Sequence, residues 1–140
     1  MIQLTPVSES SNPLIRVLIV EDVPQVRKEL RLLLQLTNGL EVVGEARNGQ
    51  EAIQQAEILI PDVVIMDLEM PILDGLQATH QIKRRNLAKR VVILSVHSKP
   101  EDISRARQAG ADDFIQKGDS YLTLIDAIIH SKKIYLEKDS

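Results

Sequence analysis

The sequence predicts a doubly wound α/β fold, in which one five-stranded parallel sheet carries helices on both faces. Short, β-branched apolar runs recur along the chain, and such runs are typical of fully buried parallel strands. Segments with helical spacing of apolar residues separate them, so strand and helix alternate through residues 14–137. Because crossovers between parallel strands are right-handed, few other arrangements suit this alternation.

The predicted strands are bounded by turn-forming or charged residues. The first runs from Leu14 to Val20, and the second alternates only loosely from Leu40 to Arg47. The other three cover residues 62–67, 90–95 and 112–116.

The predicted helices begin and end at residues that favour helix termini. The first follows Pro24 and stops at Asn38-Gly39. The next two are expected over residues 48–60 and from about Asp74. The inward faces of the first and third helices are Val26, Leu30, Leu33 and Leu34, and Leu76, Thr79 and Ile82, respectively.

The helix expected from Ser98 to Ala109 carries few apolar residues. Pro100 suits its first turn, and Gly110 ends it. Its apolar stripe is thin, which predicts a helix that is held weakly and can shift. The stripe consists of Ile103, Ala106 and Ala109.

Length and composition favour one domain and exclude several classes of function. A chain of 140 residues suits a single domain, with residues 1–13 as a flexible tail and 138–140 as the C-terminal end. A net charge of -3 and 2% aromatic residues do not favour nucleic-acid binding. The lack of cysteine excludes disulfides and thiolate metal sites, and no apolar run is long enough to span a membrane. We therefore expect a cytoplasmic protein.

Four of the predicted strands end on polar side chains or run directly into them. Glu21 and Asp22 follow the first strand, Asp67 ends the third, Ser95 ends the fourth, and Lys117 follows the fifth. Because ligands bind outside the carboxyl ends of parallel strands, these side chains are expected to converge at one edge of the sheet.

This group of side chains favours phosphoryl chemistry with a hard cation. Three carboxylates repel one another unless a cation or a proton intervenes, and an oxygen-only donor set is typical of Mg²⁺. Beside Mg²⁺ and the Lys117 ammonium, Asp67 could attack as a nucleophile and become an aspartyl phosphate, to which Ser95 could donate. Each residue alone also has a structural interpretation: Asp67 and the Glu21-Asp22 pair as helix or turn caps, and Lys117 as a solvated lysine.

Four segments resemble the motifs of response-regulator receiver domains of two-component signalling. They are Val20-Glu21-Asp22, residues 67–75 (DLEMPILDG), Ile93-Leu94-Ser95 and residues 110–117 (GADDFIQK). The resemblance covers residues 14–137, and the sequences of the loops and strands are most similar to receivers of the LuxR/NarL-type transcriptional regulators. It implies a flavodoxin-like sheet with strand order 2-1-3-4-5 and five helices.

The resemblance also implies a role for each residue of the group. Asp67 is the phosphoacceptor, and it receives its phosphoryl group from a sensor histidine kinase. Glu21 and Asp22 organise Mg²⁺ together with Asp67 and the backbone carbonyl of Glu69. Lys117 contacts the phosphoryl group.

Two further residues are implied to be the switch. Ser95 and Phe114 occupy the positions of the hydroxyl and aromatic switch residues, so phosphorylation would pull Ser95 toward the new oxygens while Phe114 repacks. The implied protein is a signalling switch that can lose its own phosphate, and it is not a turnover enzyme.

The chain departs from the common receiver pattern at three positions. Gly118 stands where many receivers have proline, which affects only the local loop. Val96 stands where a smaller residue is common, and its bulk, with Glu69 and His97 at the mouth, is predicted to slow the loss of phosphate. Phe114 lacks the hydroxyl of a tyrosine. The three histidines lack ligand-like spacing and are expected to face solvent or a partner: His80, His97 and His130.

The last predicted helix, residues 120–137, is more apolar than one sheet face requires. Either its core face is unusually broad or part of it stays exposed as an interface. Because receivers commonly meet partners in this region, we expect a homodimer through residues 99–137 that phosphorylation strengthens. No helix-turn-helix is expected after this helix, so the chain is expected to be either a stand-alone receiver or the receiver portion of a longer regulator, which would regulate transcription through a DNA-binding domain absent here. The apolar residues are Leu122, Leu124, Ile125, Ile128, Ile129, Tyr135 and Leu136.

Three other classes of protein compete with a receiver as interpretations of this sequence. A phosphohydrolase of the haloacid-dehalogenase type also uses an Asp nucleophile, Mg²⁺ and a Lys, but that family places the nucleophile on its first strand, whereas Asp67 ends the third. A module that keeps the fold without phosphorylation would not need the intact site. A nucleotide-binding protein is disfavoured because no Gly-rich phosphate loop follows the first strand.

Overall fold

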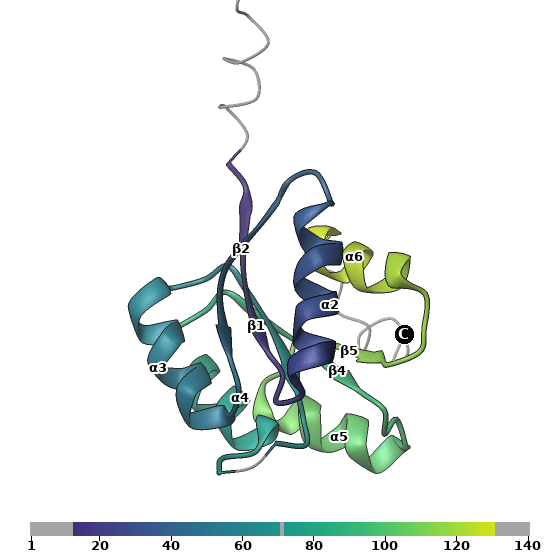
Figure 1. Cartoon of the computed structure of the whole chain (residues 1–140). Coiled ribbons are helices and arrows are strands. Elements are labelled where there is room, and N and C mark those ends of the chain that lie inside the picture. Colours follow the sequence, from purple (N-terminus) through teal and green to yellow (C-terminus); the bar gives the residue numbers. More distant parts are fainter. Residues whose placement is uncertain (1–12, 71, 131–140) are drawn as a thin grey trace, which may run out of the picture.

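The computed structural model describes residues 13–70 and 72–130, within which strands and helices alternate throughout (Figure 1). No helix in these residues is long and apolar enough to cross a membrane. Residues 1–12 of the predicted tail (residues 1–13) and the end of the last predicted helix fall outside the described residues. The elements are β1 (Ile15–Val20), α2 (Pro24–Gln35), β2 (Leu40–Ala46), α3 (Gly49–Leu59), β3 (Val63–Asp67), α4 (Gly75–Arg84), β4 (Arg90–Ser95), α5 (Pro100–Ala109), β5 (Asp113–Gln116) and α6 (Tyr121–His130).

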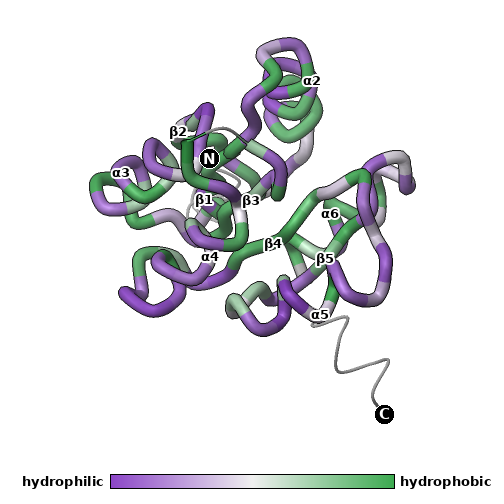
Figure 2. The backbone as a smooth tube through the Cα atoms, turned by 90° about the horizontal axis from the view of Figure 1, so that it is seen from below, coloured by the Kyte–Doolittle hydropathy of each residue, from purple (hydrophilic) through white to green (hydrophobic). Residues whose placement is uncertain are grey.

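The five strands form one parallel sheet in the order β2-β1-β3-β4-β5. Helices α2 and α6 cover one face, and α3, α4 and α5 cover the other. Figure 2 looks onto the carboxyl ends of the strands and shows the apolar strands in the middle with helices on either side. The predicted doubly wound fold and strand order are therefore confirmed.

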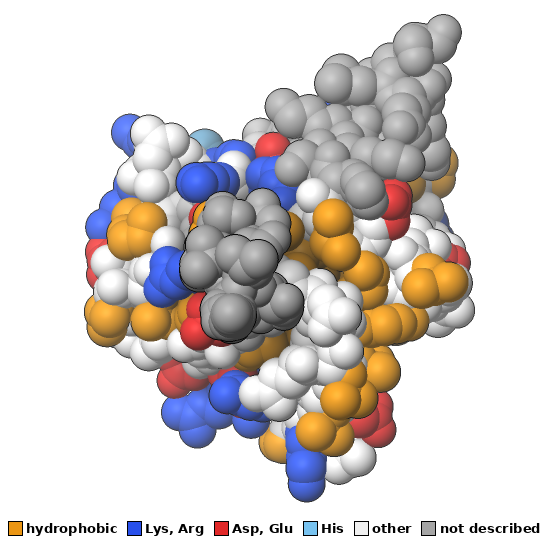
Figure 3. All heavy atoms as spheres, turned by 90° about the horizontal axis from the view of Figure 1, so that it is seen from above, with side chains coloured by type: hydrophobic (Ala, Val, Ile, Leu, Met, Phe, Trp, Pro, Cys, Tyr) orange, Lys and Arg blue, Asp and Glu red, His pale blue; other side chains and the backbone are white. Residues whose placement is uncertain are grey.

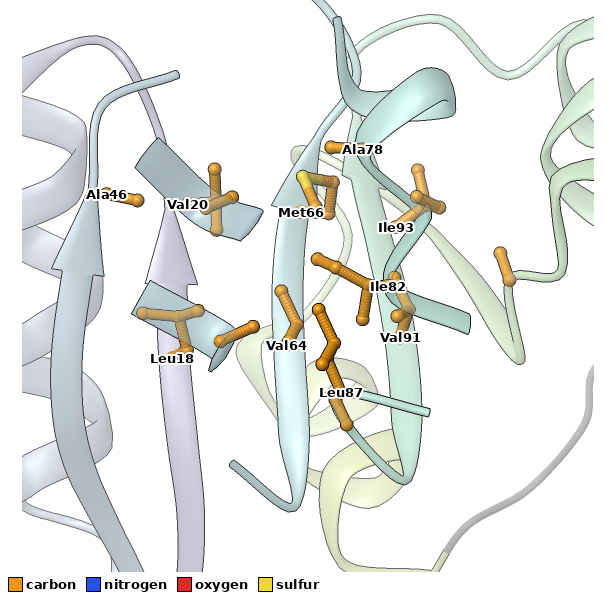
Figure 4. Close-up of a cluster of buried hydrophobic side chains, with 14 of the residues drawn as sticks. Leu18, Val20, Ala46, Val64, Met66, Ala78, Ile82, Leu87, Val91 and Ile93 are labelled. Atoms are coloured by element: carbon orange, nitrogen blue, oxygen red, sulfur yellow. The ribbon is translucent and has the colours of Figure 1, made fainter. Parts of the chain in front are cut away.

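Alternate residues of each strand supply two separate cores. Val17 and Ile19 of β1 face α2 and α6, whereas Leu18 faces α3, α4 and α5. Figure 4 shows the second of these cores, with Ile82 of α4 lying among the side chains of β3 and β4. Every residue of β3 and most residues of β1, β4 and β5 are buried, as the continuous apolar runs predicted, whereas the edge strand β2 buries only Leu40 and Ala46.

Two details of the helices differ from the sequence prediction. Leu33 was expected to point inward but is 41% exposed, because the buried face of α2 is centred on Leu30 and Leu34 and leaves Leu33 at its flank. Helix α5 is capped at Lys99 and not at Ser98, because the Asp102 carboxylate accepts the backbone N–H of Lys99.

Helix α5 makes little apolar contact with the sheet. Ala106 is its one fully buried residue, and Ile103 is partly buried. This agrees with the thin apolar stripe seen in the sequence; its mobility stays a prediction.

Thr79 offers a test of the packing under α4. Its hydroxyl is fully buried and, in the part of the chain that is described, has no hydrogen-bond partner. Thr79→Val removes the unsatisfied hydroxyl at nearly constant volume and is expected to raise the free energy of unfolding by about 1 kcal/mol. Urea denaturation measures the change. Thr123→Val, at an exposed position of α6, is the control, and an equal gain there would refute the explanation.

Candidate functional site

Three carboxylates meet at the carboxyl ends of β1 and β3, which are neighbours in the sheet. One oxygen each from Glu21, Asp22 and Asp67 lies within 4.8 Å of the other two. Glu21 is 1% exposed and Asp67 is 7% exposed, while Asp22 is partly exposed. The structure thus brings together the acidic residues that the sequence placed at separate strand ends.

Lys117 joins this acidic group from the end of β5. Its Nζ lies 2.9 Å from Oε1 of Glu21 and 3.5 Å from Oδ1 of Asp67. Burial lowers the pKa of Lys117, but the hydrogen bond and charge of Glu21 and the charge of Asp67 outweigh it and raise the pKa. Lys117 is therefore a permanent positive charge inside the site.

Asp67 is harder to ionise than an ordinary aspartate. Burial and the neighbouring charge of Glu21 raise its pKa to about 6, against the opposing effect of Lys117. One ammonium group is thus insufficient to neutralise three carboxylates. A divalent cation with oxygen ligands fits this donor set, because it would supply the missing positive charge.

Glycine is required where the loop after Asp67 returns to the sheet. The N–H of Gly75 donates to the carbonyl of Leu68 at 2.9 Å. A Cβ at Gly75 would lie 2.1 Å from the carbonyl oxygen of Asp67, too close for any other residue without a shift of the backbone. The same glycine begins α4, so the helix and the phosphoacceptor candidate are locked together.

The two predicted switch residues lie on β4 and β5, the two strands that follow β3 in the sheet. Ser95 ends β4 at 1% exposure, and its hydroxyl accepts the backbone N–H of His97 at 3.0 Å. Phe114 on β5 is 7% exposed and packs into the core under α3, α4 and α5. No hydrogen bond between described residues joins Ser95 to Asp67.

Exposed side chains from two loops meet at the mouth of the site. Nε2 of His97 lies 2.8 Å from Oε2 of Glu69, and Val96 between the strand and His97 is 57% exposed. Sequence reasoning placed these residues at the mouth but missed the contact between His97 and Glu69, because a contact between two loops leaves no periodic signal. His80 is exposed as expected, and the side chain of His130 is outside the described set.

Residues 17–129 match the family model of the response regulator receiver domain. The chain belongs to this family. The prediction of a receiver is therefore confirmed, and the phosphohydrolase alternative is excluded.

Two curated relatives share this domain. The chain is 43% identical to the transcriptional regulatory protein PdtaR of Mycobacterium tuberculosis, over 81% of its own length and 54% of that protein. It is 36% identical to the nitrate/nitrite response regulator NarL of Escherichia coli K12, over 72% and 47%.

Solved receiver domains show the same fold. The signal receiver domain of the response regulator NarL from Mycobacterium tuberculosis superposes with a TM-score of 0.80 at 29% identity, covering 84% of this chain and 95% of that one. The response regulator domain of Thermotoga maritima CheB gives 0.71 at 34% identity, over 89% and 92%. The likeness to LuxR/NarL-type receivers is confirmed. This receiver chain spans about half the length of the curated relatives it matches.

Proposed function

We propose that this receiver is a phosphorylation-activated switch of a two-component system, in which Asp67 accepts a phosphoryl group from a sensor histidine kinase. The observation that carries the proposal is the burial of Asp67 between two acidic residues and Lys117. Buried carboxylates are rare in proteins, and this one lies at a strand end beside a positive charge suited to phosphoryl oxygens.

The donor set supports Mg²⁺ as the cation of the site. Glu21, Asp22 and Asp67 would hold it with the backbone carbonyl of Glu69. Bound there, Mg²⁺ would neutralise charge on the phosphoryl oxygens. A cation bound there would favour the ionised form of Asp67, which is the form that can attack.

The transfer itself needs little from the protein beyond position and charge. A carboxylate oxygen of Asp67 attacks the phosphorus of the donor phosphohistidine as the P–N bond breaks, and the bond's electron pair returns to the imidazole. Lys117 keeps its proton and offers its charge to a phosphoryl oxygen. The products are an acyl phosphate on Asp67 and a donor histidine without its phosphoryl group, so the protein itself carries away the transferred group.

Ser95 and Phe114 are proposed to convert this new charge into a change of shape. Ser95 would move toward the phosphoryl group and donate its hydroxyl proton, which it does not use when its oxygen accepts the N–H of His97. Phe114 lies on the next strand and would fill the vacated space. Helix α5, with one fully buried residue, is the element least able to resist this movement.

Intact-mass spectrometry tests the proposal directly. Incubation with acetyl phosphate and Mg²⁺ is expected to add a single phosphoryl group to the parent chain and none to Asp67→Asn. An unmodified parent would instead favour a module that keeps the fold without phosphorylation.

Val96 is predicted to slow the loss of phosphate. More than half of its side chain is exposed at the mouth, beside the Glu69–His97 pair, where it hinders the approach of water to the acyl phosphate. Val96→Ala is expected to raise the dephosphorylation rate by about tenfold, which corresponds to 1.4 kcal/mol in barrier height. Phosphate release after removal of acetyl phosphate gives the rate, and an unchanged rate would refute this prediction.

A homodimer through residues 99–137 is proposed as the output of the switch, and regulation of transcription as its consequence. In support, Leu122 and Ile129 of α6 remain exposed. Figure 3 shows apolar side chains gathered on the side of the molecule where α2 and α6 lie. The predicted Tyr135 and Leu136 lie outside the described residues.

The dimer prediction can be tested with a matched pair of variants. Multi-angle light scattering of the parent is expected to show a larger mass with beryllofluoride and Mg²⁺ than without them. Leu122→Glu, at a 72% exposed position of α6, should abolish the increase. Ile58→Glu, at a 73% exposed position of α3 on the opposite face, should retain it. Equal masses for the parent in both states would refute the dimer.

A further inference from the structure

A series of hydrogen bonds leads from β2 through α2 to the backbone of the acidic site. Arg27 lies near the start of α2, and its guanidinium has two acceptors. Its Nη1 donates to the main-chain carbonyl oxygen of Glu21 at 2.7 Å, and its Nε donates to Oε1 of Glu45 at 3.2 Å. The Arg27 side chain is only 14% exposed, although arginines are mostly exposed in proteins.

Glu45 reaches α2 because β2 contains an extra residue. The pairing of β2 with β1 skips Val43. Since side chains alternate between the two faces of a sheet, this bulge moves Glu45 from the α3 face to the face that α2 covers. There its second carboxylate oxygen contacts Arg31, one turn after Arg27.

Every polar group of Glu21 makes a hydrogen bond. Its N–H donates to the carbonyl of Ala46 at 3.0 Å, and its carboxylate accepts from Lys117 and from the N–H of Val23. Arg27 holds the remaining group, the carbonyl, which belongs to the peptide that joins Glu21 to Asp22. Among the described residues, none makes a hydrogen bond to the Asp22 carboxylate, so its direction depends on that peptide.

We propose that Arg27 is a positioning residue for the metal site. By fixing the carbonyl of Glu21, it sets the direction in which Asp22 presents its carboxylate to the cation. This inference rests on the function proposed above. Glu45 balances the charge of Arg27, so the guanidinium orients the peptide without adding a full positive charge that would repel the cation. Groups that orient metal ligands typically contribute about 10- to 100-fold to metal affinity.

Mg²⁺ affinity measured by isothermal titration calorimetry on the full chain tests the role of Arg27. Arg27→Met is expected to raise the Kd for Mg²⁺ by about tenfold. Arg31→Met is the matched control, because Arg31 shares Glu45 but does not touch Glu21, and its Kd should stay within about twofold of the parent. Equal shifts in the two variants would overturn the proposal, since they would indicate a general effect of charge.

Kinetics distinguish positioning from a general loss of structure. In Arg27→Met, the Mg²⁺ concentration that gives half the maximal rate of phosphorylation by acetyl phosphate should rise with the Kd, while the rate at saturating Mg²⁺ stays near that of the parent. A lower rate that saturating Mg²⁺ fails to restore would contradict the role.

Glu45→Gln keeps the test valid if Arg27→Met does not fold. This change leaves Arg27 in place but weakens its hydrogen bond to residue 45. It is expected to raise the Kd for Mg²⁺ as Arg27→Met does, by a smaller factor. An unchanged Kd in every variant that folds would refute the positioning role. A parent chain that does not bind Mg²⁺ would contradict the proposed function instead.

Discussion

Lys117→Met is expected to lower the free energy of unfolding of the metal-free protein by about 3 kcal/mol, because it leaves the almost fully buried Glu21 carboxylate without its counter-charge. Two further carboxylates within 4.8 Å add to the repulsion. Methionine keeps the length and apolar stem of lysine, so the change is mainly electrostatic. Urea denaturation at pH 7.5 in EDTA measures the loss.

A double variant separates this electrostatic cause from lost packing. In the Lys117→Met background, Glu21→Gln removes the unpaired charge and should recover most of the stability. The loss should also shrink at low pH, where the carboxylates become protonated. The electrostatic cause would be contradicted if Lys117→Met lost the same stability with Glu21 as with Glu21→Gln, and the same at pH 4 as at pH 7.5. Lys117 would then act through packing alone.

Asp67→Asn is expected to stabilise the metal-free protein by about 2 to 3 kcal/mol at neutral pH. Burial and the charge of Glu21 raise the pKa of Asp67 to about 6 from 3.8, so the folded state binds a proton that the unfolded state has already released. The contribution of Asp67 to stability is therefore full below pH about 4 and is lost as pH rises through about 6. Asparagine has no charge to bury and escapes this loss.

Thermal melts across pH reveal the sign of the effect. Without metal, the melting temperatures of parent and Asp67→Asn should agree near pH 4 and separate above pH 6, with the variant higher. Mg²⁺ at pH 7.5 should raise the melting temperature of the parent more than that of the variant. A variant that melts below the parent at pH 7.5 in EDTA would contradict the raised pKa.

The layers of this fold could be predicted from the sequence because they depend on a short-range pattern. Buried parallel strands need continuous apolar runs, and residues 63–67 and 90–95 supply them. The convergence of Glu21, Asp22, Asp67 and Lys117 followed from the same argument, since the carboxyl ends of parallel strands share one edge. Their roles in phosphorylation stay a prediction.

Other features of the site depend on long-range geometry that no local pattern records. Arg27 belongs to an evident helix, yet its link to Glu21 depends on Glu45, and Glu45 faces Arg27 only because β2 skips Val43. The loose alternation of this strand in the sequence was the one available signal. The error at Leu33 has a related cause, because the spacing of the leucines does not show on which residues the buried face of α2 is centred.

Chemical trapping of the acyl phosphate tests the central claim most directly. Borohydride reduces an aspartyl phosphate to homoserine, which peptide mass spectrometry locates in the chain. After treatment of the parent with acetyl phosphate and Mg²⁺, we predict homoserine at position 67 and at no other acidic residue. Homoserine at position 22, or a phosphorylated chain in which Asp67 is unchanged, would contradict the assignment of Asp67 as the phosphoacceptor.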